Sequence, residues 1–161
     1  MAKLLIVDDE AATVDMLSTY LGLIGHETVG AFSGEEGLAS VYTEKPDLLI
    51  LDLMMPDLEG FDVCKQLRES GDYTTLPILI ISARFDQQSI DRAMSLGADV
   101  YLTKPIDLPK LTSEIIRLVE NPPDHSDRVK KAESEKAESG KPEPESKASD
   151  QPPDSKTSPD Q

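Results

Sequence analysis

Four short apolar runs, each followed at once by polar residues, constrain the fold of this chain more than any other feature. Their length and their content of Val, Ile and Leu are typical of strands that are buried on both faces of a sheet. In an open parallel sheet, ligands bind outside the carboxyl ends of the strands. We therefore expect the polar ends to converge on one crevice. The runs span 3–7, 48–51, 77–81 and 99–103, and they are followed by Asp8 and Asp9, Asp52, Ser82, and Lys104 and Pro105.

Amphipathic segments alternate with these runs, and apolar residues recur in them at helical spacing. Ser33 and Glu36 form a capping-box pattern before the second segment, and Asp107 stands where it can cap the last. A weaker run at 27–31 supplies a fifth strand, expected at an edge. This alternation requires right-handed crossovers, so we predict an α/β fold with a doubly wound, five-stranded parallel sheet and helices on both faces.

The composition changes sharply near Glu120. Residues 121–161 hold seven of the twelve prolines and contain no Ile, Leu, Met, Phe, Trp or Tyr, and Val129 is their one large aliphatic residue. So little apolar surface cannot offset the conformational entropy lost on ordering. We therefore predict an ordered domain over residues 1–120 and a disordered, Pro/Ser/Lys/Glu-rich tail over residues 121–161. His125 in this tail, like His26 before the edge strand, is predicted to be solvated.

The net charge limits the kinds of partner that the chain can bind, and the single cysteine and the N-terminal sequence bear on the compartment in which it works. The net charge of −15 divides into −12 on residues 1–120 and −3 on residues 121–161. A domain this acidic repels nucleic acid and anionic lipid, so cations and proteins are the expected partners. Cys64 is predicted to be a buried structural thiol. The N-terminal apolar run is too short for a signal peptide or a membrane span, which favours a soluble, cytoplasmic protein without membrane insertion.

The polar strand ends resemble the receiver domain of two-component response regulators, in particular the stand-alone type of the chemotaxis regulator. The resemblance covers residues 1–120. It implies a flavodoxin-like sheet with the strand order 2-1-3-4-5 and a cis peptide bond before Pro105. It rests on Asp8 and Asp9, Asp52 followed by Pro56 and Gly60, Ser82 with Ala83, and Lys104 with Pro105.

The resemblance also implies the chemistry of the site. Asp52 is the expected phosphoacceptor, since a carboxylate can attack phosphorus and form an acyl phosphate. Ser82 and Lys104 would bind the phosphoryl oxygens. Phosphorylation would draw Ser82 inward, and Tyr101, the second member of the expected switch pair, would rotate into the vacated space.

A divalent cation is the expected cofactor. Three carboxylates in one crevice repel each other, and a cation relieves this repulsion while bridging the phosphoryl oxygens. All-oxygen ligation with spare positions for water suits Mg²⁺, with Mn²⁺ possible. The expected ligands are Asp8, Asp9, Asp52 and the backbone carbonyl of Met54.

The implied function is that of a single-domain response regulator. A sensor histidine kinase or a phosphotransfer protein would phosphorylate Asp52, and the altered surface would bind a downstream protein. The chain would act as a monomer or a weak phosphorylation-dependent dimer, and as a phosphoryl acceptor with weak self-phosphorylation and self-dephosphorylation rather than as an enzyme. An intermediate or phosphate sink in a phosphorelay is an open alternative.

Three further classes fit the sequence less well. An aspartate-nucleophile phosphatase generally carries a second Asp two residues after the nucleophile, where this chain has Met54. A flavin binder would want a Gly/Ser/Thr-rich phosphate loop where Asp8 and Asp9 stand. A DNA-binding domain is not expected in residues 121–161, which show no helical stripe and carry a net negative charge.

The lifetime of the phosphorylated state can also be predicted. In receiver domains, the residues two positions after the acceptor and two after the switch hydroxyl border the phosphoryl group. They are Met54 and Arg84 in this chain. Neither side chain offers a carboxylate or amide that could orient an attacking water, so we predict slow self-dephosphorylation.

Overall fold

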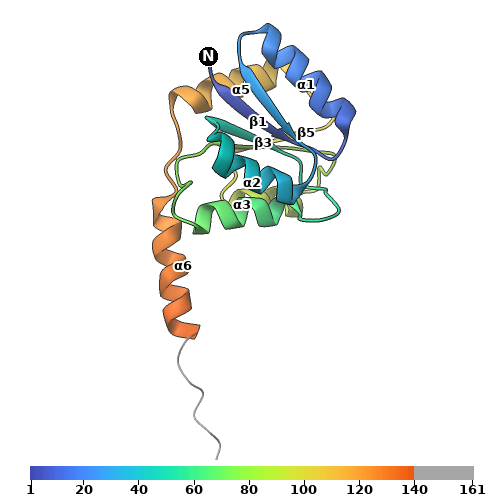
Figure 1. Cartoon of the computed structure of the whole chain (residues 1–161). Helices are drawn as coiled ribbons and strands as arrows, with labels where there is room; N and C mark the ends of the chain where they lie inside the picture. The colour runs from blue at the N-terminus through green and yellow to red at the C-terminus, as the bar shows by residue number, and fades with distance from the viewer. Residues whose placement is uncertain (140–161) are drawn as a thin grey trace, which may run out of the picture.

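Five parallel strands form the centre of the structure, and the computed structural model describes residues 1–139 of the chain (Figure 1). The strand order is β2-β1-β3-β4-β5, as predicted. The strands are β1 (Lys3–Val7), β2 (Glu27–Ala31), β3 (Leu48–Leu51), β4 (Ile78–Ser82) and β5 (Val100–Thr103). The helices are α1 (Ala11–Leu23), α2 (Gly34–Glu44), α3 (Gly60–Glu69), α4 (Gln87–Ser95), α5 (Leu108–Glu120) and α6 (Ser126–Ser139).

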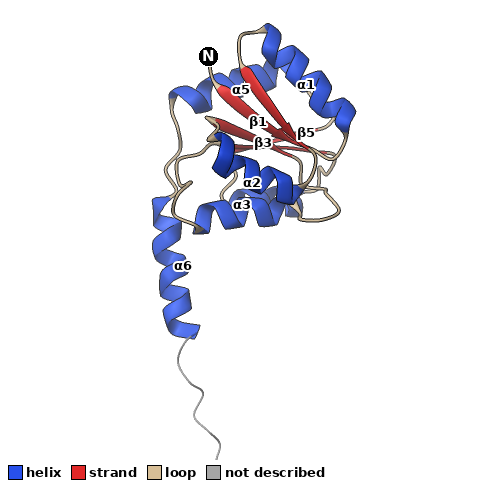
Figure 2. Cartoon of the chain, viewed as in Figure 1, coloured by secondary structure: helices blue, strands red, loops and turns tan. Residues whose placement is uncertain are grey.

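Helices cover both faces of the sheet, as the alternating pattern predicted (Figure 2). The apolar residues of α1 and α5 form one buried cluster with one face of the sheet, and those of α2, α3 and α4 form a second cluster with the other face. Cys64 of α3 is buried, as predicted, and burial raises the pKa of its thiol to about 11. Within residues 1–139, the structure contains no helix that is both long and apolar enough to span a membrane.

The local signals for helix starts are also confirmed. The Ser33 hydroxyl accepts the N–H of Glu36 at 3.1 Å, and the Asp107 carboxylate accepts the N–H of Lys110 at 3.1 Å. Three strand boundaries differ from their expected places by a residue. Strand β4 begins at Ile78 rather than at residue 77, and β5 begins at Val100 rather than at residue 99. Ser82 is the last residue of β4 rather than the first residue after it.

Helix α6 corrects the prediction of disorder from residue 121 onward. Residues 126–139 of the predicted tail form a helix that extends away from the rest of the structure (Figure 1). The prediction considered only apolar burial, whereas α6 is attached through polar contacts of His125 and Arg128. His125 is half-buried and hydrogen-bonded, and so is His26, whose Nδ1 accepts the N–H of Ala2 at 3.3 Å, so the prediction that both histidines are solvated was wrong. The rest of the predicted tail, residues 140–161, lies outside the described residues.

Candidate functional site

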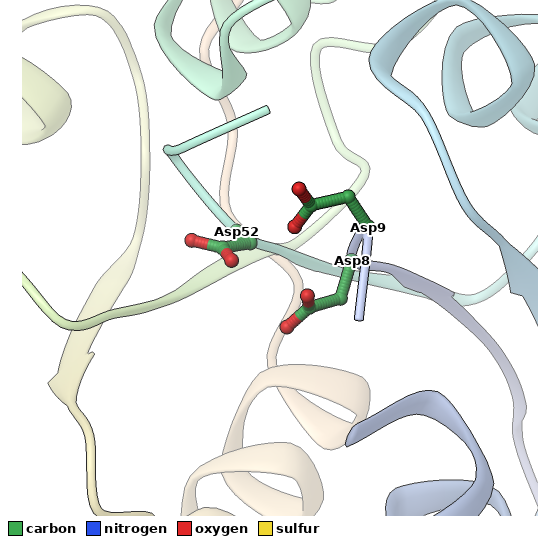
Figure 3. Close-up of side chains that lie close together, drawn as sticks. All are labelled: Asp8, Asp9 and Asp52. Carbon is green, nitrogen blue, oxygen red and sulfur yellow. The ribbon is translucent and has the colours of Figure 1, made fainter. Parts of the chain in front are cut away.

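Three carboxylates meet at the carboxyl ends of two neighbouring strands. Asp8 and Asp9 follow β1, and Asp52 follows β3, which pairs with β1 in the register Val7 to Leu51. One ligand oxygen of each carboxylate lies within 4.8 Å of the others. Asp8 and Asp52 are 3% and 6% exposed, and Asp9 is exposed. Figure 3 shows the three side chains gathered at one place, as the strand ends predicted.

Lys104 completes the charged part of the site from the end of β5. Its Nζ donates hydrogen bonds to Asp8 Oδ2 at 3.0 Å and to Asp52 Oδ2 at 3.2 Å. Its backbone N–H donates to the Ser82 carbonyl, so the end of β4 holds it in place. The peptide bond between Lys104 and Pro105 is cis, as the resemblance implied.

The surroundings raise the pKa values of both Asp52 and Lys104. Burial raises the pKa of Asp52, and the negative charge of Asp8 adds to this, while the Met54 N–H and Lys104 oppose it. Burial by itself would lower the pKa of Lys104, but the hydrogen bond to Asp8 and the charge of Asp52 outweigh it and raise that pKa. Lys104 therefore stays protonated at neutral pH as a fixed cation beside Asp52.

The donor set fits a divalent cation. Three carboxylates against one ammonium leave two negative charges uncompensated, and the oxygens are the hard ligands that ions such as Mg²⁺ and Mn²⁺ prefer. The exposed carboxylate of Asp9 leaves one side of the cluster accessible. The site could therefore hold a divalent cation together with water or phosphoryl oxygens.

The loop after β3 brings Met54 to the same crevice. The Met54 N–H donates to Asp52 Oδ1 at 3.2 Å, and its side chain is 50% exposed. Gly60 keeps this loop close to the strand end, because a Cβ at Gly60 would lie 2.3 Å from the Asp52 carbonyl oxygen. A pocket of about 310 Å³ opens beside the loop, and its lining includes Asp9, Met54 and Arg84.

Both expected switch residues bind the backbone of Arg84. The Ser82 hydroxyl is fully buried and accepts the N–H of Arg84 at 3.1 Å. The Tyr101 hydroxyl donates to the carbonyl of Arg84 at 2.7 Å. Tyr101 is half-buried, and burial raises the pKa of its phenol. The loop between β4 and α4 therefore connects the two residues.

Sequence reasoning missed Asp57, which lies in the loop after β3, and Arg68, which lies at the opposite edge of the sheet near the starts of β4 and β5. The Asp57 carboxylate accepts the N–H groups of Gly34 and Glu35 at the start of α2, and these and other backbone hydrogen bonds lower its pKa to about 2. Arg68 is 1% exposed and pairs with Asp99 at 2.9 Å. The sequence carried no signal for either contact, because Asp57 precedes α3 in the chain but binds the start of α2, and residue type does not mark a buried arginine.

Comparisons with known proteins agree with this geometry. Among curated proteins, the alkaline phosphatase synthesis transcriptional regulatory protein PhoP of Bacillus subtilis is 40% identical over 113 residues, which cover 70% of this chain and 46% of that protein. The chain spans about half the length of the curated relatives it matches.

Two solved structures match this chain along nearly their whole length. A Francisella response regulator receiver domain superposes with a TM-score of 0.70 at 31% identity, covering 74% of this chain and 98% of that one. The Vibrio cholerae chemotaxis protein CheY4 superposes with a TM-score of 0.68 at 32% identity, covering 73% and 98%. Residues 4–116 match the sequence profile of the response regulator receiver domain. The family match, the strand order and the acidic cluster agree, so the chain belongs to the receiver domain family of two-component response regulators.

Proposed function

We propose that Asp52 accepts a phosphoryl group from the phosphohistidine of a sensor histidine kinase or a phosphotransfer protein. The observation that carries this proposal is the sharing of the Lys104 ammonium between Asp8 and Asp52 at the end of the buried sheet. An Asp52 oxygen forms a bond to phosphorus as the phosphorus–nitrogen bond breaks. The electron pair of the broken bond stays on the nitrogen, and the imidazole leaves as a neutral ring with its proton on the other nitrogen.

The neighbouring residues orient and neutralise the incoming group. Mg²⁺ held by Asp8, Asp9, Asp52 and the Met54 carbonyl would supply charge neutralisation when bound. Lys104 stands where it can transfer a hydrogen bond from Asp52 to a phosphoryl oxygen. The hydroxyl of Ser82 can donate to a phosphoryl oxygen while still accepting the Arg84 N–H, because a hydroxyl both donates and accepts.

In this proposal the chain is a reactant that carries the phosphoryl group, and it is not an enzyme that turns over a substrate. Its output is a changed protein-binding surface, and transfer of the group onward in a relay uses the same site chemistry. The PhoP relative is by its name a transcriptional regulator, but the match covers 46% of that protein, and residues 4–116 of this chain match the receiver domain. The net charge of −12 on residues 1–120 disfavours direct binding of this part to nucleic acid.

Uptake of a phosphoryl group should depend on Mg²⁺ bound by Asp9. The full chain, incubated with acetyl phosphate and Mg²⁺, should gain one base-labile phosphoryl group by intact mass spectrometry, and a chelator should prevent it. Asp9→Ala should need about tenfold more Mg²⁺ for half-maximal uptake, because one of the few direct protein ligands is lost. Asp15→Ala, an exposed acidic residue of α1, is the matched control. Uptake that persists in the chelator would contradict the assigned site.

The phosphorylated state should decay slowly, because Met54 and Arg84 border the crevice without a group that orients water. Replacing them together, as Met54→Asn/Arg84→Glu, supplies an amide and a carboxylate there. We expect decay at least roughly tenfold faster than in the wild type, a small part of what a positioned general base contributes. Decay is measured after the donor is removed by desalting. Equal decay rates would show that these side chains do not control access of water.

A further inference from the structure

The start of α6 is fastened to the rest of the structure by polar contacts. The backbone N–H of His125 donates to the Thr74 carbonyl at 2.8 Å, and its ring Nε2 lies 2.8 Å from Asp99 Oδ1. Val129, one turn further, lies beside Gly71 at the end of α3. His125–Val129 is called the latch below.

Arg128 of the latch binds the last turn of α4. Its Nη1 donates to the Ser95 carbonyl and its Nη2 to the Met94 carbonyl at 3.4 Å. The last carbonyls of a helix lack partners within the helix and favour a cation, so Arg128 acts as a C-terminal cap supplied by another helix. Its Nε donates to His125 Nδ1 at 3.1 Å. Since Nδ1 accepts this bond, the neutral ring carries its proton on Nε2 and donates it to Asp99.

Asp99, the residue that His125 binds, has further partners in the core. Asp99, which accepts the hydrogen bond from His125, also pairs with the buried Arg68 at 2.9 Å and accepts the N–H of Ile78 at 2.9 Å. These contacts fix Asp99 at the junction of α3, β4 and β5. Helix α6 packs against α3, and Arg128 of the latch also binds the C-terminal end of α4, so the latch contacts both helices.

The other end of α4 is connected to the phosphoryl site. Asp86 caps α4 by accepting the N–H of Ser89 at 2.9 Å. Two residues earlier, the backbone of Arg84 binds both Ser82 and Tyr101. One helix is thus held at its N-terminal end by the switch residues and at its C-terminal end by the latch.

We propose that the latch fastens α4 in the arrangement in which Lys104 pairs with the free Asp52 carboxylate, so that docking of α6 opposes phosphorylation and phosphorylation releases α6. The proposal rests on the proposed function. An acyl phosphate on Asp52 replaces the pairing with Lys104 and engages Ser82, which biases the Arg84 loop and α4 away from the position that the latch fits. Coupling between two sites is reciprocal, so an effect of phosphorylation on α6 requires an equal effect of α6 on the affinity of the phosphoryl site.

Release of α6 should be visible in its backbone amides. An isolated helix of about 14 residues is marginal in water, so an undocked α6 loses much of its helical protection. Hydrogen exchange of the full chain should therefore show faster exchange over 126–139 in Arg128→Ala. Lys130→Ala is the matched control, because it removes the same charge from an exposed side chain of the same helix. Equal protection of α6 in Arg128→Ala and the wild type would overturn the latch.

The reciprocal effect is measured with beryllofluoride and Mg²⁺, which mimic an acyl phosphate on Asp52. The mimic should speed exchange of α6 in the wild type, and Arg128→Ala should bind it about fivefold more tightly, the lower end of typical coupling between sites. Lys130→Ala should bind it like the wild type. Binding that is equal in Arg128→Ala and the wild type would overturn the coupling but leave the proposed function standing. If the wild type binds no mimic and takes no phosphoryl group, the proposed function fails, and the inference fails with it.

Discussion

An Asp52→Asn variant is expected to take up no phosphoryl group from acetyl phosphate under conditions in which the wild type is labelled once per chain. An amide cannot form the acyl phosphate that a carboxylate forms. The change is otherwise small, because the amide oxygen can still accept the Met54 N–H that now reaches Asp52 Oδ1 at 3.2 Å. Asp15→Asn on the exposed side of α1 should be labelled like the wild type. Labelling that survives in Asp52→Asn would move the acceptor to another residue.

The same variant should be more stable than the wild type at neutral pH in the absence of a divalent cation. Burial raises the pKa of Asp52 in the folded chain, so the proton stabilises the folded state. That stabilisation is present below the pKa of the unfolded chain and is lost as the pH rises through the folded pKa. The Asn variant, which stays neutral, should therefore melt a few degrees higher at pH 7, and its advantage should shrink in acid. Calorimetry at several pH values measures the difference.

The sheet and the acidic cluster could be predicted because each depends on a short, local pattern. Buried strands appear in the sequence as runs of Val, Ile and Leu, and the topology of a parallel sheet places the residues after those runs at one edge of the sheet. Asp8, Asp52 and Lys104 therefore could be assigned to one crevice without knowledge of any distance. The resemblance added the strand order and the cis peptide, which spacing alone does not determine.

The contacts that the sequence did not predict are polar and long-range. Arg84 links Ser82 to Tyr101 through its backbone, and a backbone contact leaves no trace in residue type. The docking of α6 was missed for a related reason. Composition indicates how much apolar surface a segment can bury, but it does not show that Arg128 binds the end of α4, a helix more than 30 residues earlier in the sequence. Residues that are usually exposed, such as His125, Arg128 and Arg68, give no sequence signal when the fold buries or pairs them.

Loss of the buried Arg68 should produce the largest fall in stability of the changes considered. Its guanidinium donates to Asp99 at 2.9 Å and to three backbone carbonyls, those of Tyr73, Leu76 and Gly97, at 2.6, 2.7 and 3.0 Å. Arg68→Met keeps an unbranched side chain in the core but leaves these acceptors without their donor. Breaking a buried pair by removing one partner costs about 3–5 kcal/mol, a large part of the roughly 5–15 kcal/mol that stabilises a typical domain.

Thermal melting should therefore fall by about 10–20 °C in Arg68→Met. The matched control is Arg117→Met on α5, where a side chain that is 57% exposed pairs with Glu114, and a surface pair of this kind contributes about 0–1 kcal/mol. The double variant Arg68→Met/Asp99→Asn should recover part of the loss, because the uncompensated carboxylate is removed while an amide oxygen remains to accept the N–H of Ile78. A melting temperature of Arg68→Met that matches Arg117→Met would show that the buried network contributes no net stability. The part of the loss that the double variant recovers measures the cost of the unpaired Asp99 charge, and the part that remains measures the lost hydrogen bonds to the backbone carbonyls and the lost packing of Arg68.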